Sequence, residues 1–105
     1  MNDLTFWMYI STANIPRTDA AQAIDAIVRV SRGRNAALKV TGALIFSGEL
    51  FAQLIEGPAE SIFELRSSIA RDERHGDILT MADGEQNRRE FADWSLAYAG
   101  SSLFV

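Results

Sequence analysis

Hydrophobic and polar positions alternate along the chain in a pattern that predicts five strands and two helices. The clearest part is a pair of apolar runs, Val40 to Phe46 and Leu50 to Ile55, joined by Ser47-Gly48-Glu49. A short polar connection that contains glycine between two such runs is typical of a β-hairpin. We therefore expect this hairpin to form the centre of a sheet.

The second run of the hairpin contains a glutamine between two large apolar residues. Phe51, Gln53 and Ile55 share one face of this strand, because successive side chains point to opposite faces. Burying an amide without hydrogen-bond partners costs roughly 1–3 kcal/mol. We expect another part of the molecule to supply a partner for Gln53.

Three other segments are predicted to be strands, and the first of them is dense in aromatic and β-branched residues. They are Leu4 to Ser11, Ile78 to Ala82, and Phe91 to Tyr98, which includes Trp94. The first of these carries apolar side chains on both faces, which predicts a position inside the sheet. Tyr9 lies on one of its two faces.

Two segments between the strands have helical periodicity. The first begins near Asp19, where Asp19 and Gln22 have the spacing of a capping box, and ends near Gly33. The second begins at Pro58, a residue that suits the first turn of a helix, and ends near Ala70.

The predicted order of elements is β-α-β-β-α-β-β, within one domain over residues 1–105. A strand, a crossover helix and a returning strand, occurring twice, predict an α+β sandwich of ferredoxin-like type. In this fold class a five-stranded mixed sheet carries both helices on one face.

The opposite face of that sheet has no predicted cover. If Tyr9 and Gln53 point toward the helices, the residues that alternate with them point away. These residues are apolar: Leu4, Phe6, Met8, Ile10, Ala52 and Leu54. Because such a patch is too apolar for the surface of a monomer, we expect a homo-oligomer packed through the back of the sheet.

Composition narrows the possible functions. The 105 residues contain no cysteine, which excludes disulfides and thiolate chemistry and favours a cytoplasmic protein. The net charge of -4 leaves no basic excess to displace phosphate counterions, which argues against nucleic acid as a partner. No apolar run approaches the roughly 20 residues that span a bilayer, so we expect no membrane segment.

Three polar residues, Tyr9, Asn35 and Gln53, are candidates for a binding site. Singly, each has an ordinary structural explanation. The tyrosine suits a core with its hydroxyl at the edge, the asparagine suits a turn after a helix, and the glutamine suits a bond to backbone. The predicted fold brings all three to the sheet face beneath the helices, which indicates a shared site.

Several short motifs are spread over nearly the whole chain. They are Tyr9-Ile10-Ser11, Asn35, Val40-Thr41-Gly42, Phe51-Ala52-Gln53-Leu54-Ile55-Glu56-Gly57, Asp72-Glu73-Arg74-His75 and Arg89-Glu90-Phe91-Ala92-Asp93-Trp94-Ser95. In these motifs the chain resembles the BLUF domain, a blue-light sensor that uses FAD. The resemblance implies the same α+β sandwich that the periodicity predicts.

The resemblance implies a flavin between the two helices, with FAD expected and FMN or riboflavin as alternatives. By the same resemblance, Ile27 and Ile69 would sandwich the isoalloxazine ring, and Asn35 would bond its polar edge. Gln53 would lie beside flavin N5 and O4 and would be bonded to Tyr9.

By the same resemblance, further positions would lie around the rest of the cofactor. Asp72, Arg74 and His75 would surround its ribityl and phosphate end. Arg34, next to the flavin-binding asparagine, would bond the ring carbonyl or crowd it. Trp7, Trp94 and Tyr98 would be core or sheet-back aromatics, and in a photosensor they would compete with Tyr9 as electron donors.

The resemblance also implies a mechanism without substrate turnover, so we expect a photosensor rather than an enzyme. Excitation would drive electron and proton transfer from Tyr9 to the flavin, after which the Gln53 amide rotates or tautomerises. A phenol is oxidisable and acidic, and an amide exchanges donor for acceptor with little change in volume. The signal would pass to a separate protein partner.

Two other functions stay open. Arg34, Lys39 and Ser68 depart from the family pattern, which would suit a flavin-free interaction module that kept the fold. A small ferredoxin-like hydrolase ranks third, because no nucleophile has an adjacent base.

We expect no metal at His75, which suits a solvated helix exit, because metal sites need more ligands. Glu56, at a strand end, could act as a general base, but Gly57-Pro58 after it favour a place at the start of the second helix, where a carboxylate favours the dipole.

Overall fold

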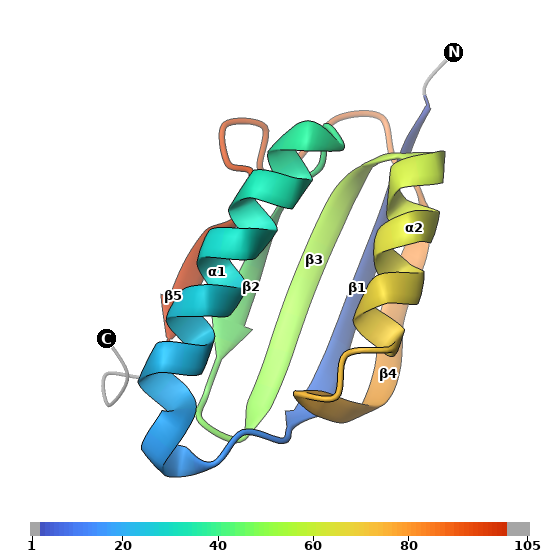
Figure 1. Cartoon of the computed structure of the whole chain (residues 1–105). Helices are drawn as coiled ribbons and strands as arrows, with labels where there is room; N and C mark the ends of the chain where they lie inside the picture. The colour runs from blue at the N-terminus through green and yellow to red at the C-terminus, as the bar shows by residue number, and fades with distance from the viewer. Residues whose placement is uncertain (1–2, 101–105) are drawn as a thin grey trace.

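A five-stranded sheet covered on one face by two helices forms the fold (Figure 1). The computed structural model describes residues 3–100. Its elements are β1 (Leu4–Ala13), the 3-10 turn η1 (Arg17–Asp19), α1 (Ala20–Ala37), β2 (Thr41–Phe46), β3 (Leu50–Pro58), α2 (Ala59–Ala70), β4 (His75–Glu85) and β5 (Ala97–Gly100). This arrangement confirms the predicted α+β sandwich. Neither of the described helices is long and apolar enough to cross a membrane.

The sheet has the strand order β4-β1-β3-β2-β5. Only β2 and β5 run parallel, and the other neighbouring pairs are antiparallel. The predicted hairpin is present as β2 and β3, and Gly48 in its turn has a φ of 102°, which favours glycine. Tyr9 of β1 lies directly opposite Gln53 of β3, so the two central strands place both side chains on the helix-covered face.

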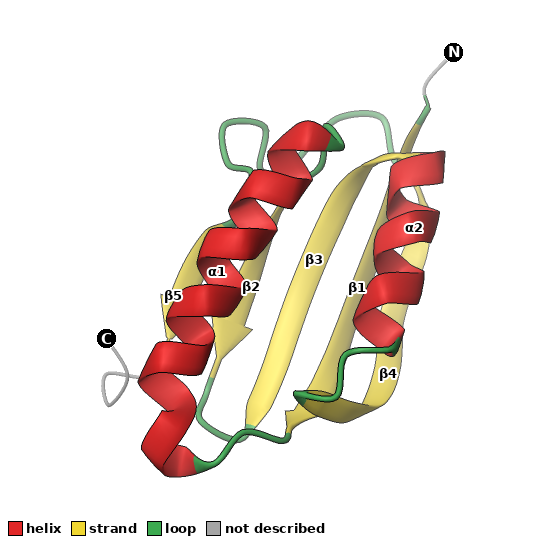
Figure 2. Cartoon of the chain, in the orientation of Figure 1, coloured by secondary structure: helices red, strands yellow, loops and turns green. Residues whose placement is uncertain are grey.

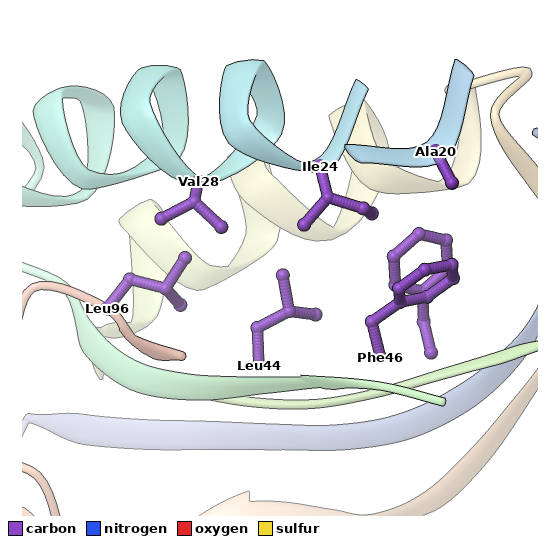
Figure 3. Close-up of a cluster of buried hydrophobic side chains, with 7 residues drawn as sticks. Ala20, Ile24, Val28, Leu44, Phe46 and Leu96 are labelled. Carbon is purple, nitrogen blue, oxygen red and sulfur yellow. The ribbon is translucent and has the colours of Figure 1, made fainter. Parts of the chain in front are cut away.

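Each helix packs on its own hydrophobic cluster. The α1 cluster contains Ala20, Ile24, Val28, Leu44, Phe46, Phe51 and Leu96 (Figure 3). The α2 cluster contains Trp7, Tyr9, Val40, Ile55, Ile62 and Leu65. Burying one such Leu or Ile side chain stabilises the fold by about 1.5–3 kcal/mol. The core is therefore divided in two, and the division lies between the helices.

Helix α1 differs from the prediction at both ends. It continues past Gly33 to Ala37, so the predicted stop is wrong and Asn35 lies within the last turn rather than after the helix. Gly33 is exposed, and one glycine in a helix costs about 1 kcal/mol relative to alanine, which does not end the helix. The predicted capping box is also wrong, because the N-cap residue Asp19 makes no side-chain cap bond.

The helix ends in a Schellman motif that has lysine where glycine is usual. Lys39 N donates to Ala36 O at 3.2 Å and Val40 N donates to Asn35 O at 2.8 Å. Lys39 has a φ of 61°, in the left-handed region. A side chain in that region costs roughly 1–2 kcal/mol, so the motif holds its shape against local strain.

Lys39→Gly is expected to raise the free energy of unfolding by about 0.5–1 kcal/mol, because glycine adopts the left-handed conformation freely. Denaturant unfolding measures the change. Ala37→Gly, two residues earlier and inside the helix, is the control and should lower the same free energy by about 1 kcal/mol. A loss of stability in Lys39→Gly would show that the lysine side chain contributes more than its conformation costs.

Three strands differ from the predicted bounds by three or more residues at one or both ends. Strand β3 continues beyond Ile55 to Pro58, and β4 begins at His75 rather than Ile78. The predicted strand from Phe91 to Tyr98 is wrong, because β5 covers only Ala97–Gly100 and the preceding segment is a loop (Figure 2). That loop is held by isolated bonds, such as Gly42 N to Trp94 O at 3.2 Å, rather than by a strand ladder.

The back of the sheet carries the apolar face that the strand alternation predicts. Met8, Ile45 and Leu79 are 40%, 55% and 57% exposed on it. The two helices lie on the other face and leave this one without cover from helices (Figure 1).

Candidate functional site

A cavity of about 410 Å³ lies between α1 and α2, above the sheet. This volume is within the roughly 300–1,000 Å³ of small-molecule sites. The lining residues come from both helices, from the central strands and from the segment after α2: Tyr9, Ile27, Val30, Ser31, Arg34, Asn35, Leu44, Phe51, Gln53, Ile55, Leu65, Ser68, Ile69, Arg71, Asp72, Arg74 and His75. The structure thus brings together every residue expected from the family resemblance to bind a cofactor, and places the expected electron donor Trp94 elsewhere.

A buried hydrogen bond forms the floor of the cavity. Tyr9 Oη donates to Gln53 Oε1 at 2.5 Å, and the two side chains are 3% and 9% exposed. Burial raises the pKa of the Tyr9 phenol well above its usual value, and the negative charge of Asp72 raises it further. The phenol therefore stays protonated and remains a donor at physiological pH.

Two amide groups of the floor have polar atoms left over. Gln53 accepts from Tyr9 through Oε1, while its Nε2 has no partner among residues 3–100. Asn35 is 2% exposed and donates through Nδ2 to Ser95 O at 2.8 Å, while its Oδ1 has no partner among the same residues. Since both residues line the cavity, one donor and one acceptor are available to an occupant.

Each helix contributes an apolar residue to the side walls of the cavity. Ile27 of α1 and Ile69 of α2 are half-buried lining residues at the edges of the two hydrophobic clusters. A flat apolar occupant between them would join the two clusters into one core. This arrangement suits an aromatic ring system better than a compact polar molecule.

A polar bridge connects the helices at the rim of the cavity. Arg34 Nη1 of α1 donates to Ser68 Oγ of α2 at 2.9 Å, and the arginine is exposed. Both residues also line the cavity, so the bridge crosses from one wall to the other.

His75 fastens the end of α2 to the sheet. Its Nε2 donates to Ile69 O at 2.7 Å, because a carbonyl can only accept, and its Nδ1 is hydrogen-bonded to Ser11 Oγ at 2.7 Å. The predicted solvated helix exit is wrong, since the ring is half-buried and both nitrogens are bonded. The bond to Ile69 fixes the backbone that carries one wall of the cavity.

Asp72 and Arg74 form an ion pair at the same end of the cavity. Arg74 Nη2 lies 2.6 Å from Asp72 Oδ2, and the Arg74 backbone N also donates to Asp72 Oδ1 at 2.9 Å. The bonded guanidinium lowers the pKa of Asp72, and the carboxylate in turn raises the pKa of Arg74. This guanidinium is therefore already neutralised at the rim.

Two residues of the loop before β5, Trp94 and Leu96, have different environments. Trp94 is 57% exposed in the loop before β5 and does not line the cavity. Leu96 is buried in the α1 cluster, where it faces Val28 and Leu44 (Figure 3). The main-chain oxygen of Leu96 accepts from Arg32 Nε at 3.0 Å, which ties this loop to α1.

Glu56 is a buried carboxylate in β3, so the prediction that it begins a helix is wrong. Its Oε1 accepts from Gln86 Nε2 at 2.7 Å and from Glu90 N at 2.8 Å. Its Oε2 accepts from Thr41 Oγ1 and Phe91 N, both at 2.8 Å. Burial alone would raise the pKa of this carboxyl, but the four donors outweigh it and lower the pKa.

Two features of the site region were not assigned from the sequence. Trp7 stacks on Tyr9, with ring centroids 4.4 Å apart. The signal for this contact in the sequence is the two-residue spacing, which places both side chains on one face of the strand. The donors to Glu56 lie 15 to 35 residues away along the chain, and no local pattern indicated them.

A family model described as "Sensors of blue-light using FAD", or BLUF, matches residues 4–97. The beta subunit of a photoactivated adenylate cyclase from Euglena longa is 36% identical over 103 residues, which are 97% of this chain and 12% of that protein. The blue light- and temperature-regulated antirepressor BluF of Escherichia coli K12 is 32% identical over 95 residues, which are 90% of this chain and 22% of that protein.

The fold has a close match among solved structures. The dark-state structure of the BLUF protein BlrB has a TM-score of 0.89 and 36% identity, over 95% of this chain and 74% of that one. The family description is that of a sensor, and its match covers most of the chain. The chain belongs to the BLUF family of blue-light sensors that use FAD.

Proposed function

We propose that this chain binds a flavin in the cavity between α1 and α2 and reports blue light through the Tyr9–Gln53 hydrogen bond. One observation carries the proposal. Gln53 Nε2 has no partner among the described residues although the other end of the same amide is bonded to a buried phenol at 2.5 Å. The Gln53 amide is hydrogen-bonded at its oxygen and available at its nitrogen. A ligand in the cavity could therefore favour the rotated amide, in which donor and acceptor exchange places.

The residues present fit an isoalloxazine ring. The apolar side chains of Ile27 and Ile69 would lie against its two faces. The polar edge of the ring presents carbonyl acceptors and an N–H donor. Gln53 Nε2 would donate to a carbonyl, and Asn35 Oδ1 would accept from the N–H.

When bound, the flavin supplies absorption of blue light and, once excited, takes an electron from a neighbouring phenol. Tyr9 is the phenol in the cavity floor, and its proton has an acceptor in Gln53 Oε1. The Gln53 amide would then rotate or pass to its tautomer, and return of the electron and the proton to Tyr9 would restore the phenol. Either change exchanges donor for acceptor at the cavity surface with almost no change in volume, which is the switch that we propose.

The form of the flavin is part of the proposal. The family description names FAD, and a similar structure, BlrP1 from Klebsiella pneumoniae, is described as containing FMN. We propose FAD, which the family description names. FMN and riboflavin are the alternatives, because the residues of the cavity floor would contact only the ring that the three flavins share. Mass spectrometry of the pigment released from the purified protein identifies the form.

Flavin binding is the test of this function. The purified chain should be yellow, or should become so when mixed with FAD, FMN or riboflavin, with quenching of flavin fluorescence. Asn35→Leu, which removes the acceptor at Oδ1, should weaken binding. A protein that takes up none of the three flavins would overturn the proposal and favour the flavin-free interaction module.

The bridge between Arg34 and Ser68 is expected to slow flavin exchange. Removing it in Arg34→Gln or Ser68→Ala should raise the rate of flavin dissociation by up to about tenfold, the worth of one polar bond. Stopped-flow displacement by excess riboflavin measures the rate.

The double variant separates this bridge from a simple effect of charge. If the two residues act together, Arg34→Gln with Ser68→Ala should dissociate no faster than either single variant. Arg29→Gln, an exposed change on the same helix, is the control and should leave the rate unchanged. Additive effects of the two changes would contradict the bridge.

The proposal includes a homo-oligomer formed through the back of the sheet. Flat apolar sheet faces pack against one another, and the face around Met8, Ile45 and Leu79 spans the sheet without a helix over it. Leu79→Glu should shift sedimentation at micromolar concentration toward the monomer. Phe63→Glu, at a 75% exposed position on α2, should not. A stable monomer in the unchanged protein would rule out this assembly.

The output of the sensor is a change in contact with another protein. We propose a downstream protein partner in the cytoplasm, in keeping with the absence of cysteine from the sequence. Capture on the immobilised chain in light and in darkness, followed by mass spectrometry, identifies it.

A further inference from the structure

Trp7 covers one face of the Tyr9 ring from outside the cavity. The two residues are next to each other on the same face of β1, and their rings stack with centroids 4.4 Å apart and planes inclined by 26°. Trp7 is 2% exposed and does not line the cavity. The other aromatic neighbour of Tyr9, His75, is more distant at 6.0 Å and is tilted by 59°. Trp7 is therefore in closer ring contact with the Tyr9 phenol than His75 is.

The indole of Trp7 is itself held at its edge and on its face. Its Nε1 donates to Thr80 Oγ1 of β4 at 2.9 Å. The guanidinium carbon of Arg66, on α2, lies 4.7 Å from the indole centroid. Arg66 also donates to Thr80 Oγ1 at 3.2 Å and pairs with Asp83 at 2.9 Å. A side chain that only filled space in the core would need no particular orientation. These contacts, in contrast, fix the rotation of the Trp7 indole.

The plane of a phenol determines where its hydrogen points. The oxygen lone pair is conjugated with the ring, so the O–H bond prefers to lie in the ring plane. Gln53 Oε1 receives this hydrogen at 2.5 Å, and a hydrogen bond weakens steeply when its angle departs from linear. Rotation of the Tyr9 ring would thus misdirect the donor without moving either backbone.

We propose that Trp7 is a positioning residue that sets the plane of the Tyr9 ring and so the alignment of the Tyr9–Gln53 hydrogen bond. The inference rests on the function proposed above for that bond. Thr80 acts one step further out, because it orients the indole through Nε1.

The first test uses the flavin-free protein and nuclear magnetic resonance. Tyr98→Phe makes Tyr9 the only tyrosine of the two in the sequence. Tyr98 Oη has no partner in the described part of the chain, so this background loses no bond. Ring rotation of Tyr9 should be about tenfold faster in Trp7→Leu, which cannot stack, and close to unchanged in Trp7→Phe. It should be about threefold faster in Thr80→Val, which removes the bond to the indole.

The second test uses the flavin-loaded protein under blue light. The yield of the light-induced spectral shift per bound flavin should fall in the order of the ring-rotation rates, most in Trp7→Leu and least in Trp7→Phe. Ile62→Ala, which removes volume from the same hydrophobic cluster, is the control for stability and should change neither reading. Thr80→Val keeps the test valid if Trp7→Leu does not fold.

The two readings distinguish failure of this inference from failure of the proposed function. A Trp7→Leu or Thr80→Val protein with unchanged ring rotation and unchanged yield would overturn the positioning role and leave Trp7 as packing. Faster rotation with an unchanged yield would overturn it as well. If the unchanged protein binds flavin but gives no spectral shift, the proposed function fails, and ring rotation alone still decides whether Trp7 sets the plane of Tyr9.

Discussion

Gln53→Leu is expected to bind flavin and to give no red shift of the flavin band under blue light. Leucine has similar bulk and stays compatible with Phe51 and Ile55 on the same strand face. It supplies neither the acceptor for the Tyr9 hydroxyl nor a donor to the cavity. The apolar walls at Ile27 and Ile69 are unchanged, so the ring keeps most of its contacts.

Difference spectra before and after illumination, normalised to bound flavin, measure this result. The Tyr9 hydroxyl loses its partner in the variant, which should lower the free energy of unfolding by about 1–3 kcal/mol. Gln22→Leu makes the same change at an exposed position of α1 and should keep a normal shift. A normal shift in Gln53→Leu would remove Gln53 from the switch.

Glu56→Gln is expected to cause the largest loss of stability, about 2–4 kcal/mol in the free energy of unfolding at neutral pH. The carboxylate is 0% exposed and receives two donors at each oxygen. A glutamine has one oxygen and one NH2 group. Two of the four donors would then face another donor in a buried place.

The pH dependence of this loss has a definite sign. The pKa of Glu56 is lowered in the folded protein from its ordinary value of 4.5. A lowered folded pKa contributes stability that is fully present above the unfolded value and is lost as pH falls through the folded pKa. The difference between the unchanged protein and Glu56→Gln should therefore be largest at neutral pH and shrink as pH falls below 4.5.

Denaturant unfolding at neutral and acidic pH measures both effects. Glu49→Gln, at an exposed position in the hairpin turn, is the matched control and should change stability little. If the difference between the unchanged protein and Glu56→Gln stayed constant or grew as pH fell, the charged carboxylate would not be the stabilising form.

The parts of the fold that follow from local pattern were predictable from the sequence. Alternation along the hairpin placed Gln53 between Phe51 and Ile55, and the same two-residue period placed Tyr9 with Trp7 on one face of β1. The direct opposition of Tyr9 and Gln53 depends on strand register, which neither run encodes by itself.

The errors in the prediction share a physical cause, which is that distant contacts outweighed local signals. Gly33 is a local stop signal, but the Schellman bonds at Lys39 and the bond from Asn35 to Ser95 hold the following turn in the helix. Trp94 lies in a run that alternates like a strand, but its segment is held by isolated bonds to Gly42, Glu56 and α1 rather than by a strand ladder.

The candidate site was predictable as a set of residues but not as a geometry. The family motifs indicated Asn35, Gln53 and Tyr9, whereas the available atoms of the two amides became clear only from their hydrogen bonds. Arg34 and Ser68 each departed from the family pattern, and only the structure pairs them across the cavity. Contacts of this kind join residues 34 positions apart, beyond the reach of periodicity.

The central claim is that light changes the hydrogen bonding of a flavin held beside Tyr9 and Gln53. The most direct measurement is the absorption spectrum of the flavin-loaded protein in darkness, under blue light and after return to darkness. The account predicts a small red shift of the flavin band that forms under light and reverses in the dark. A bound flavin whose spectrum bleaches or does not change under blue light would contradict it.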